Sequence, residues 1–263
     1  MNDKQLGIYI SSYDGCSDLW DTFFMLFDRF WPDCKYPVYL INNVLPYQHE
    51  NITVVNTGQE IHWFYRTLVS LKQLKEKYIL FMLEDYFISK IVNNGDIAEI
   101  LDFMEANEAY YYQLSVGCTG SKEPCRVNVT AETEYPISLQ PAIWNRQRLI
   151  KLLEDINGKT PWDVEYYLVN AFRDKKGSIK GAYHDTRDIL GYKNGVLRGK
   201  WIPSTIKYYK KTGIDIYTGN RQVMSSGKML KYLTATFVQK HVPKRIKAIG
   251  KSILKAVNFD YLK

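Results

Sequence analysis

Apolar residues in this chain form short continuous runs, which alternate with segments where they recur every three or four positions. The most informative run covers residues 78–83, six uncharged and mostly apolar residues that lead directly into Glu84 and Asp85. A continuous run of this kind predicts a strand buried on both faces, in the middle of a parallel or mixed sheet. We expect the rest of the fold to be organised around this strand.

Strand and helix patterns alternate on both sides of this central run. Apolar runs predict strands at 6–12, 36–43, 52–55, 110–116 and 177–182, and helical spacing predicts helices at 17–27, 58–77, 97–106, 147–154 and 160–172. Residues 117–136, rich in Gly, Thr, Glu and Pro, are expected to form an irregular loop or hairpin of the kind that shapes binding pockets. The pattern predicts an α/β domain over residues 1–225, with a mostly parallel sheet flanked by helices.

A different pattern begins at residue 226. Two helices are expected there, one over 226–239 and one beyond Pro243, each with an apolar stripe. In the second helix the stripe is bordered by Lys and Arg, which is typical of a helix that lies in a membrane interface and is too polar to span it. The alternative is that the stripe packs on the main domain or on a second subunit. The apolar positions are Met229, Leu230, Leu233, Phe237, Ile246, Ile249, Ile253 and Val257.

The formal net charge of +7 is concentrated in this tail. Residues 226–263 carry nine Lys or Arg and one acid, Asp260, so residues 1–225 keep 26 bases and 27 acids. This division argues against a basic groove on the main domain. It favours contact between the tail and an anionic membrane surface, where each base adds about 1 kcal/mol.

The composition is that of a foldable, enzyme-sized chain. Its 263 residues suffice for one large domain, or for a domain with an appendage. With 21 Tyr among them, exposed aromatic rings are available for flat amphipathic ligands such as sugars and bases. The four cysteines form no Cys-x-x-Cys pair, so we expect reduced thiols. The chain enters its first strand without a basic region and apolar core of a signal peptide, so we expect a cytoplasmic protein.

Glu84 and Asp85 are the first candidates for a functional site. Ligands of open α/β sheets collect at the carboxyl ends of the strands, and two neighbouring carboxylates repel each other unless a cation is present. Oxygen ligands suit Mg²⁺ or Mn²⁺, which are commonly held by one or two carboxylates together with the phosphates of a substrate. The alternative is that the two residues open a surface turn.

Four segments of the chain resemble bacterial glycosyltransferases of the GT-A fold, in particular enzymes of capsule and lipopolysaccharide assembly. They are Ser-Tyr-Asp-Gly-Cys-Ser-Asp-Leu-Trp (12–20), Phe-Trp-Pro-Asp-Cys (30–34), Pro-Val-Tyr-Leu (37–40) and Leu-Glu-Asp-Tyr-Phe (83–87). The resemblance spans residues 5–205. It implies a nucleotide-sugar donor whose diphosphate is bridged by a divalent metal to an acidic motif at the end of a central strand. That motif is usually Asp-x-Asp or Asp-Asp, and here its first member is Glu84.

The resemblance also implies roles for individual residues. Asp85 would be the metal ligand, with Glu84 supporting it or reaching the ribose. The first turn would lie against the nucleotide base, Arg66 would approach the diphosphate, and sugar or acceptor contacts would follow the predicted loop. The residues of the first turn are Ser12, Tyr13 and Asp14, and the acceptor-side candidates are Gln140, Trp144 and Trp162. Arg66 is equally interpreted as a surface ion-pair former, and Gln140 and Trp144 as an edge residue and a core residue.

A second acidic pair, Asp163 and Glu165, follows Thr160-Pro161. Inverting transfer requires a carboxylate that takes the proton from the acceptor hydroxyl, and the resemblance implies such a base at the start of a helix after the acceptor loop. Asp163 already has a structural role in a capping box with Thr160, so Glu165 is the first choice and Asp163 the second. The positive end of the helix dipole is expected to hold the pKa of this base down.

Two later features complete the expected site. The resemblance implies a further metal ligand late in the chain, for which His184 is the candidate, although a lone His among polar residues is more often a loop residue. Residues 192–201 contain two glycines with Arg198 and Lys200, which suits a mobile lid that closes over the diphosphate, or else a solvated basic loop.

Two functions follow from these observations. The first is a metal-dependent, inverting glycosyltransferase that extends a glycan, expected to be lipid-linked, in cell-surface polysaccharide synthesis at the inner membrane face. The second is a non-catalytic protein that binds membranes or nucleic acid through its basic tail. Nucleic-acid binding needs no apolar stripe and is steeply salt-dependent, whereas membrane attachment needs both stripe and charge.

Overall fold

The computed structural model describes residues 5–59, 62–114, 126–130, 136–156, 158, 160–173 and 178–241. Within helix 161–173 the side chain of Trp162 lies outside the described residues, as does most of the predicted loop at 117–136. The second tail helix, beyond Pro243, also lies outside them. The chain divides into two compact units, Met1–Gly195 with Ile216–Gly219, and Val196–Asp215 with Asn220–Lys263.

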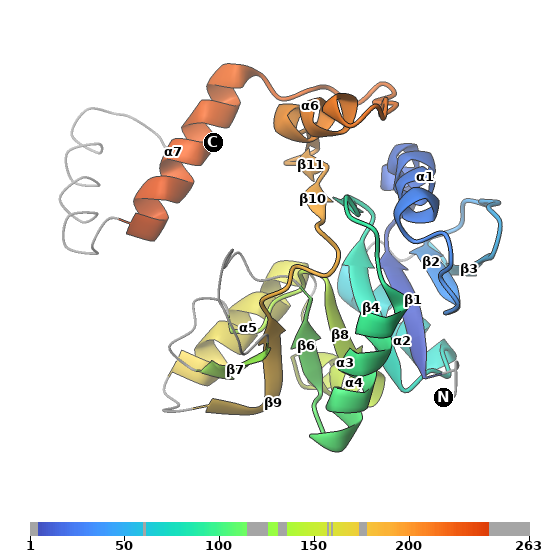
Figure 1. Cartoon of the computed structure of the whole chain (residues 1–263), viewed down its shortest axis with the longest axis vertical. Helices are drawn as coiled ribbons and strands as arrows, with labels where there is room; N and C mark the ends of the chain where they lie inside the picture. The colour runs from blue at the N-terminus through green and yellow to red at the C-terminus, as the bar shows by residue number, and fades with distance from the viewer. Residues whose placement is uncertain are drawn as a thin grey trace. The chain divides into compact units, whose positions relative to one another are not determined.

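The first unit contains an eight-stranded sheet and five α-helices among its described residues (Figure 1). Its strands are β1 (Leu6–Ser11), β2 (Val38–Asn42), β3 (Ile52–Asn56), β4 (Tyr78–Leu83), β5 (Tyr86–Phe87), β6 (Tyr111–Gln113), β7 (Arg126–Thr130), β8 (Ala142–Asn145), β9 (Ser178–Asp185) and β10 (Lys193–Asn194). Its helices are the 3-10 helix η1 (Asp14–Leu19) and α1 (Trp20–Phe30), α2 (Trp63–Gln73), α3 (Asn94–Ala106), α4 (Arg146–Ile156) and α5 (Pro161–Arg173). Strands β5 and β10 form a separate two-stranded ribbon.

The large sheet has the order β3-β2-β1-β4-β8-β6-β9-β7. β4 lies near its middle and is almost completely buried, as its apolar run predicts. The prediction of a mostly parallel sheet is confirmed in part: four strand pairs are parallel, but β8 pairs antiparallel with both β4 and β6, and β7 pairs antiparallel with β9, so the sheet is mixed. β8 escaped prediction because its four residues run directly into α4, and β7 lies within the segment expected to be irregular.

Helices cover both faces of this sheet. Side chains alternate between the faces of a strand, so Tyr9, Phe81 and Tyr111 share one face with α2, α4 and α5 in a single apolar cluster. α3 covers the opposite face, where Phe103 contacts Tyr112, and α1 is tied to α3 by the Trp31 indole, which donates to Asn94. The helices therefore leave the carboxyl ends of the parallel strands as the edge where loops gather.

The second unit contains a short hairpin and two helices in its described part. The hairpin pairs β11 (Val196–Leu197) with β12 (Lys200–Trp201), and the helices are α6 (Pro203–Lys211) and α7 (Ser226–His241). Trp201 is fully buried, and its backbone exchanges hydrogen bonds with Gln222 and Met224. The predicted helix at 226–239 is confirmed by α7.

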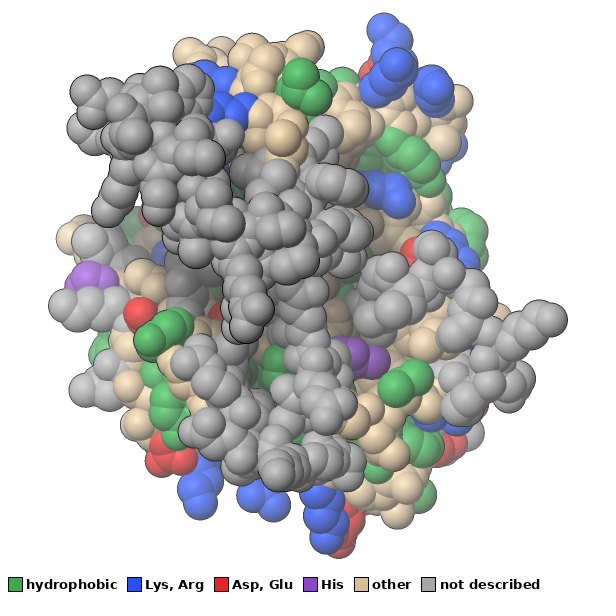
Figure 2. Space-filling view, turned by 90° about the vertical axis from the view of Figure 1, so that its left-hand side faces the viewer, with side chains coloured by type: hydrophobic (Ala, Val, Ile, Leu, Met, Phe, Trp, Pro, Cys, Tyr) green, Lys and Arg blue, Asp and Glu red, His purple; other side chains and the backbone are tan. Residues whose placement is uncertain are grey.

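The described surface carries mixed charge, and one apolar residue of the tail is exposed on it. Basic and acidic side chains both appear along the lower edge of the face drawn in Figure 2, as the near-balance of 26 bases and 27 acids in residues 1–225 leads one to expect. Leu230, one of the apolar positions of the tail, is 67% exposed on α7. No helix among the described residues is long and apolar enough to cross a membrane.

Candidate functional site

The candidate site begins where three neighbouring parallel strands end. Ser11 of β1 is in register with Ile41 of β2 on one side and with Leu83 of β4 on the other. The residues that follow these strands, among them Asn43 and the pair Glu84-Asp85, therefore leave the sheet at one edge. In open α/β sheets this edge is where ligands bind.

Asp14 organises the backbone at this edge. Its carboxylate accepts hydrogen bonds from the backbone N–H groups of Asn43 (3.1 Å), Val44 (3.2 Å) and Leu45 (3.3 Å). The Asp14 N–H in turn donates to Oδ1 of Asn43 over 3.3 Å. Asp14 thus joins the turn after β1 to the turn after β2. Its predicted contact with a nucleotide base stays a prediction, but the structure gives it a sufficient role in shaping that turn.

Ser12 and Tyr13, the other residues of the first turn, differ in exposure. Ser12 is 3% exposed, and its hydroxyl oxygen accepts a hydrogen bond from the indole N–H of Trp20 over 2.8 Å. Its side chain therefore faces the interior, so a direct donor contact through its hydroxyl does not fit this geometry. Tyr13 is 46% exposed, so its ring offers a flat surface at the edge of the sheet.

Arg66 is buried beside this turn, which is contrary to its interpretation as a surface ion-pair former. It is 4% exposed, its Nη1 donates to Oδ1 of Asn43 over 3.0 Å, and its guanidinium lies 5.5 Å from the ring centroid of Tyr13. Burial lowers the pKa of Arg66, while the nearby charges of Glu84 and Asp14 act in the opposite direction. Its Nε has no hydrogen-bond partner among the residues that the structure describes.

The carboxylates Glu84, Asp85 and Glu165 are all near enough to Tyr86 for their charges to act on its hydroxyl. Burial raises the pKa of the Tyr86 hydroxyl well above its ordinary value, and the charges of Asp85, Glu165 and Glu84 raise it further. The ring of Tyr192 packs against Tyr86 with centroids 5.2 Å apart. The two acidic groups that the sequence singled out, 80 positions apart, therefore act on one phenol.

Glu165 has the environment of a general base. It is half-buried on α5, and its Oε1 accepts a hydrogen bond from the backbone N–H of Leu139 over 3.3 Å. Burial raises its pKa, and the hydrogen bond from Leu139 opposes that shift. The expectation that the helix dipole would hold the pKa down is therefore wrong in sign. Glu165 is the fifth residue of α5, where the dipole is weak and desolvation outweighs it.

The carboxylate of Asp163 is used in hydrogen bonds at the start of α5. Its Oδ2 accepts hydrogen bonds from the backbone N–H of Thr160 (2.7 Å) and from the Thr160 hydroxyl (3.0 Å). This is the carboxylate half of the predicted capping box, and Asp163 is exposed. The contacts favour Glu165 over Asp163 as the candidate base.

The acceptor-side candidates separate into a surface residue and a core residue. Gln140 is exposed, and its Oε1 accepts a hydrogen bond from Nε2 of Gln113 over 3.0 Å. It is next in sequence to Leu139, which binds Glu165. Trp144 is 1% exposed and packs edge-on against Tyr111 in the apolar cluster. Trp144 is therefore a core residue in this structure and presents no surface to a sugar.

His184 lies in β9 and not in a loop. Its Nε2 is 2.9 Å from the carbonyl oxygen of Pro136, and burial lowers its pKa. Among the residues that the structure describes, no group of three or more His, Cys, Asp and Glu side chains is arranged to hold a metal ion, so Glu84, Asp85 and His184 do not form such a set. The half-buried pair Glu84-Asp85 can supply only part of a metal's coordination, as in sites that substrate phosphates complete.

Arg198 and Lys200 belong to the second unit. They flank Gly199 in the hairpin of β11 and β12, where Arg198 (φ 50°) and Gly199 (φ 71°) have the left-handed backbone of a tight two-residue turn. Arg198 is exposed and Lys200 half-buried. Their action on a leaving diphosphate stays a prediction.

Three residues of the site escaped the sequence analysis. Asn43 follows a predicted strand, so the rule that ligands gather at parallel strand ends was a usable signal for it. Tyr86 directly follows the acidic pair, but its nearness to Glu165 depends on the packing of α5. Tyr192 reaches the site only through the pairing of β10 with β5, and no local pattern predicts so distant a contact.

A groove at the other end of the sheet is separate from this site. It has a volume of about 630 Å³ and lies at the start of β4, with Lys77, Glu105 and Arg148 among its lining residues. The length of β4, from Tyr78 in the groove to the residue after Leu83, separates it from Glu84 by about 20 Å. It contains none of the candidate site residues.

Fold and site together define an α/β protein with a candidate ligand site at the carboxyl edge of its sheet. Solved structures that it resembles are transferases that use nucleotides, and each similarity is distant. A fragment of S. aureus TarS in complex with UDP aligns with a TM-score of 0.44 and 15% identity, over 69% of this chain and 60% of that one. GlyE, a glycosyltransferase of Streptococcus pneumoniae, aligns with a TM-score of 0.41 and 16% identity, over 68% of this chain and 46% of that one.

A cytidylyltransferase from Leptospira borgpetersenii aligns with a TM-score of 0.42 and 10% identity, over 81% of this chain and 99% of that one. No protein-family model matches the chain. No curated protein matches it either. Since the chain spans 60% of the TarS fragment at a TM-score below 0.5, functional conclusions rest on the geometry of its own site.

Proposed function

We propose that this protein is a glycosyltransferase that moves a sugar from a nucleotide-sugar donor to a glycan acceptor. The observation that carries the proposal is the edge where β1, β2 and β4 end in register: Glu84 and Asp85 directly follow β4 there, and Glu165 is near enough for its charge to act, with theirs, on the Tyr86 hydroxyl. A donor diphosphate needs a cation-binding carboxylate, and the transfer needs a base; the three acids supply both kinds of group within one site.

The nucleotide end of the donor is proposed to lie over the turn after β1. Tyr13 offers an exposed ring for stacking a base, and the buried Arg66 has an unused Nε donor next to it. A buried cation with a free donor gains a charge-assisted hydrogen bond when an anionic or carbonyl oxygen arrives. Asn43 orients Arg66 for this contact through its 3.0 Å hydrogen bond.

A divalent cation, Mn²⁺ or Mg²⁺, is proposed to bind Asp85, with Glu84 beside it and the donor diphosphate as the remaining ligands. Two half-buried carboxylates without a third protein ligand fit this hard cation, because Mg²⁺ keeps water and phosphate oxygens in its shell. Such a cation would neutralise the charge that develops on the leaving diphosphate.

Glu165 is proposed as the base of an inverting transfer. Its carboxylate takes the proton of the acceptor hydroxyl while the hydroxyl oxygen forms a bond to the anomeric carbon, and the bond from that carbon to the diphosphate oxygen breaks. A pKa raised by burial makes Glu165 a stronger base than an exposed carboxylate. Gln140 is proposed to contact the acceptor, because it is next in sequence to Leu139, whose N–H binds Glu165. A lipid-linked acceptor at an anionic membrane remains the expectation from the tail.

The first test is a thermal-shift screen of UDP, GDP, CMP and dTDP, each with and without Mn²⁺. One nucleotide at about 100 times its Kd adds about 2.7 kcal/mol to the unfolding free energy, which raises Tm by on the order of 5 °C for a chain of this size. We expect this shift to require Mn²⁺ and to be lost in Asp85→Asn. Asp102→Asn, an exposed acid on α3, is the matched control and should keep it.

Absence of any nucleotide-dependent shift in the wild-type protein would overturn the proposal. The alternative function through the tail would then be examined with the full chain. Binding to vesicles that contain anionic lipid, but not to a DNA duplex of equal charge density, favours membrane attachment; steeply salt-dependent binding to the duplex favours nucleic acid.

A further inference from the structure

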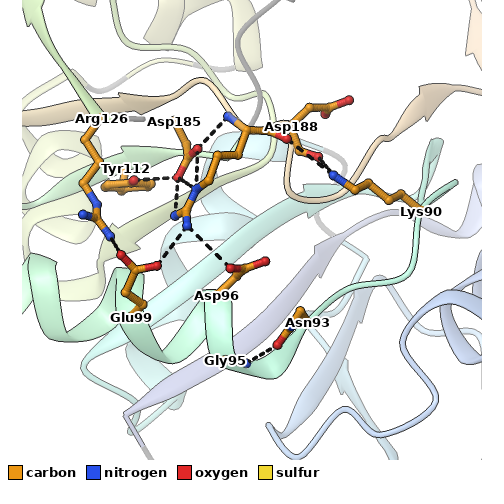
Figure 3. A network of polar contacts seen from close by, with 10 residues as sticks. Lys90, Asn93, Gly95, Asp96, Glu99, Tyr112, Arg126, Asp185 and Asp188 are labelled. Atoms are coloured by element: carbon orange, nitrogen blue, oxygen red, sulfur yellow. Dashed lines mark hydrogen bonds and ion pairs between the residues drawn. The ribbon is translucent and has the colours of Figure 1, made fainter. Parts of the chain in front are cut away.

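The connecting segment, residues 186–195, runs from the end of β9 to the end of β10 and begins with an ion-pair network on the α3 face. The guanidinium of Arg187 donates to Oδ2 of Asp185 (2.8 Å) and to Oε2 of Glu99 (2.9 Å), and it lies 3.5 Å from Oδ1 of Asp96. Asp185 is fully buried, and its Oδ2 also accepts a hydrogen bond from the hydroxyl of Tyr112 over 2.7 Å. In Figure 3 Asp96 and Glu99 extend from α3 toward Asp185, so the network holds the start of the segment to the helix.

The middle of the connecting segment is hydrogen-bonded to Ser89 and Lys90, which follow β5. Lys90 Nζ donates to the carbonyl oxygen of Asp188 over 3.2 Å (Figure 3), and Ser89 donates from its backbone N–H to Leu190 and from its hydroxyl to Gly191. At Gly191 the backbone has φ 55°, and a Cβ atom would lie 2.8 Å from Cβ of Lys90. Only glycine allows this close approach.

The end of the connecting segment reaches the candidate site. Tyr192 packs on Tyr86, and the backbone N–H of Gly195 donates to the carbonyl oxygen of Asp85 over 2.7 Å. A Cβ atom at Gly195 would lie 2.1 Å from the ring of Phe87, so the backbone at Gly195 lies too close to this ring to leave room for a side chain. The contacts at this end hold the backbone of the proposed metal ligand and the ring beside Glu165.

We propose that Arg187 is a positioning residue of the candidate site, acting through the connecting segment on Tyr192 and on the backbone of Asp85. Its catalytic consequence rests on the proposed function. Arg187 touches neither candidate carboxylate, but it fixes the first residues of a ten-residue segment whose last residue binds Asp85. Loss of its three acidic partners would release the segment at the end remote from the site.

The competing explanation is that Arg187 only fastens α3 to β9. Both explanations predict a loss of global stability when Arg187 is replaced. They differ in where the effect appears: a fastening role lowers the protection of α3 and β9, whereas a positioning role loosens residues 189–195 selectively and alters the site. Arg126 provides a matched control, because it pairs with the same Glu99 and lies on β7, outside the connecting segment.

The test compares Arg187→Gln with Arg126→Gln in the full chain. Amide hydrogen exchange of residues 192–195 is expected to quicken about tenfold or more in Arg187→Gln and to stay within twofold of wild type in Arg126→Gln. In donor hydrolysis or transfer, kcat is expected to fall by at least tenfold in Arg187→Gln, while KM for the donor changes less than twofold, because Tyr13 and Arg66 belong to the turn after β1 and to α2 and not to the connecting segment. Arg187→Lys should recover part of kcat, because it keeps the charge.

Unchanged exchange at residues 192–195 in Arg187→Gln, or an equal change in both variants, would overturn the positioning role. If Arg187→Gln does not fold, Glu99→Gln takes its place, since it removes one partner of Arg187, and the same comparison applies. The exchange measurement needs no ligand, so it decides this proposal even if the wild-type protein binds none of the four nucleotides, which would instead count against the proposed function.

Discussion

The guanidinium of Arg66 and the amide of Asn43 are joined by a hydrogen bond of 3.0 Å between two side chains that are 4% and 8% exposed. Arg66 lies on α2 and Asn43 follows β2, so the bond connects a helix start to a strand end at the candidate site. A buried guanidinium is costly unless its donors are used, and Nε has no partner within the described part of the chain. The bond to Asn43 therefore holds a buried cation in a fixed position at this edge of the sheet.

The first prediction concerns the Asn43 partner. Asn43→Leu leaves Nη1 of Arg66 buried without its acceptor, so we expect the unfolding free energy to fall by about 1–3 kcal/mol. Urea unfolding monitored by tryptophan fluorescence measures this change. Asn107→Leu, which removes an amide of similar size from an exposed site on the end of α3, is the control and should cost less. Equal losses in the two variants would contradict a special role for the Arg66–Asn43 bond.

The second prediction concerns the pH dependence that Glu165 creates. Its folded-state pKa is raised above the ordinary 4.5, so the folded protein holds this proton more tightly than the unfolded chain does. The contribution of Glu165 to stability is therefore complete below about pH 4.5 and is lost as the pH rises through the raised pKa. We expect Glu165→Gln to be more stable than wild type at pH 7.5 and equally stable near pH 4.

Activity should follow the opposite course. The base must be ionised, so kcat of the wild-type enzyme is expected to fall as the pH drops through the pKa of Glu165, and Glu165→Gln should lose about 100-fold or more at every pH. Thermal unfolding across pH 4 to 8 and a pH–rate profile make the two measurements. A Glu165→Gln variant that keeps wild-type kcat would exclude Glu165 as the base.

The third prediction separates the two candidate bases. Asp163→Ala removes the acceptor for two hydrogen bonds from Thr160, so the helix start should lose about 1 kcal/mol, but kcat should stay within a few-fold of wild type. Asp163→Asn retains one acceptor oxygen and should recover part of the stability. A loss of activity in Asp163→Asn as large as that in Glu165→Gln would reverse the assignment of the base.

The fourth prediction concerns His184. Burial lowers its folded-state pKa below the ordinary 6.5, so its contribution to stability is present above pH 6.5 and is lost as the pH falls through the folded pKa. Between pH 7 and pH 5 we expect the unfolding free energy to fall less in His184→Gln than in the wild-type protein. The same variant should keep the Mn²⁺-dependent nucleotide shift, because Nε2 of His184 is directed to the carbonyl of Pro136. Loss of that shift would restore His184 as a metal ligand.

Several elements of the fold can be predicted from the sequence, because one face or both faces of each element are apolar. β4 is a continuous buried run, and α1 and α3 keep their apolar residues at helical spacing. β8 and the ribbon of β5 and β10 cannot be predicted in this way, since strands of two to four residues are too short to show a periodic pattern of apolar residues. Their pairing is decided by distant partners, which no local pattern specifies.

The candidate site was predictable to the same extent. Glu84 and Asp85 stand out because two adjacent acids end an apolar run, and Glu165 because the capping contact already accounts for Asp163. Trp144 could not be assigned from sequence, since a tryptophan that lines a sugar site and one that fills a core have the same local signature; only its burial against Tyr111 decides between them.

The amide of Gly195 binds the carbonyl of Asp85, and Gly195 is also the last residue of the first unit before the chain enters the second at Val196. Tension on the chain at Val196 therefore loads the hydrogen bond to Asp85 and the β5–β10 ribbon before it loads the eight-stranded sheet. The chain returns to the first unit at Ile216, so Gly195 is one of the covalent connections between the two units. A pull that reaches Gly195 acts on the backbone of Asp85 directly, because the two residues share a hydrogen bond.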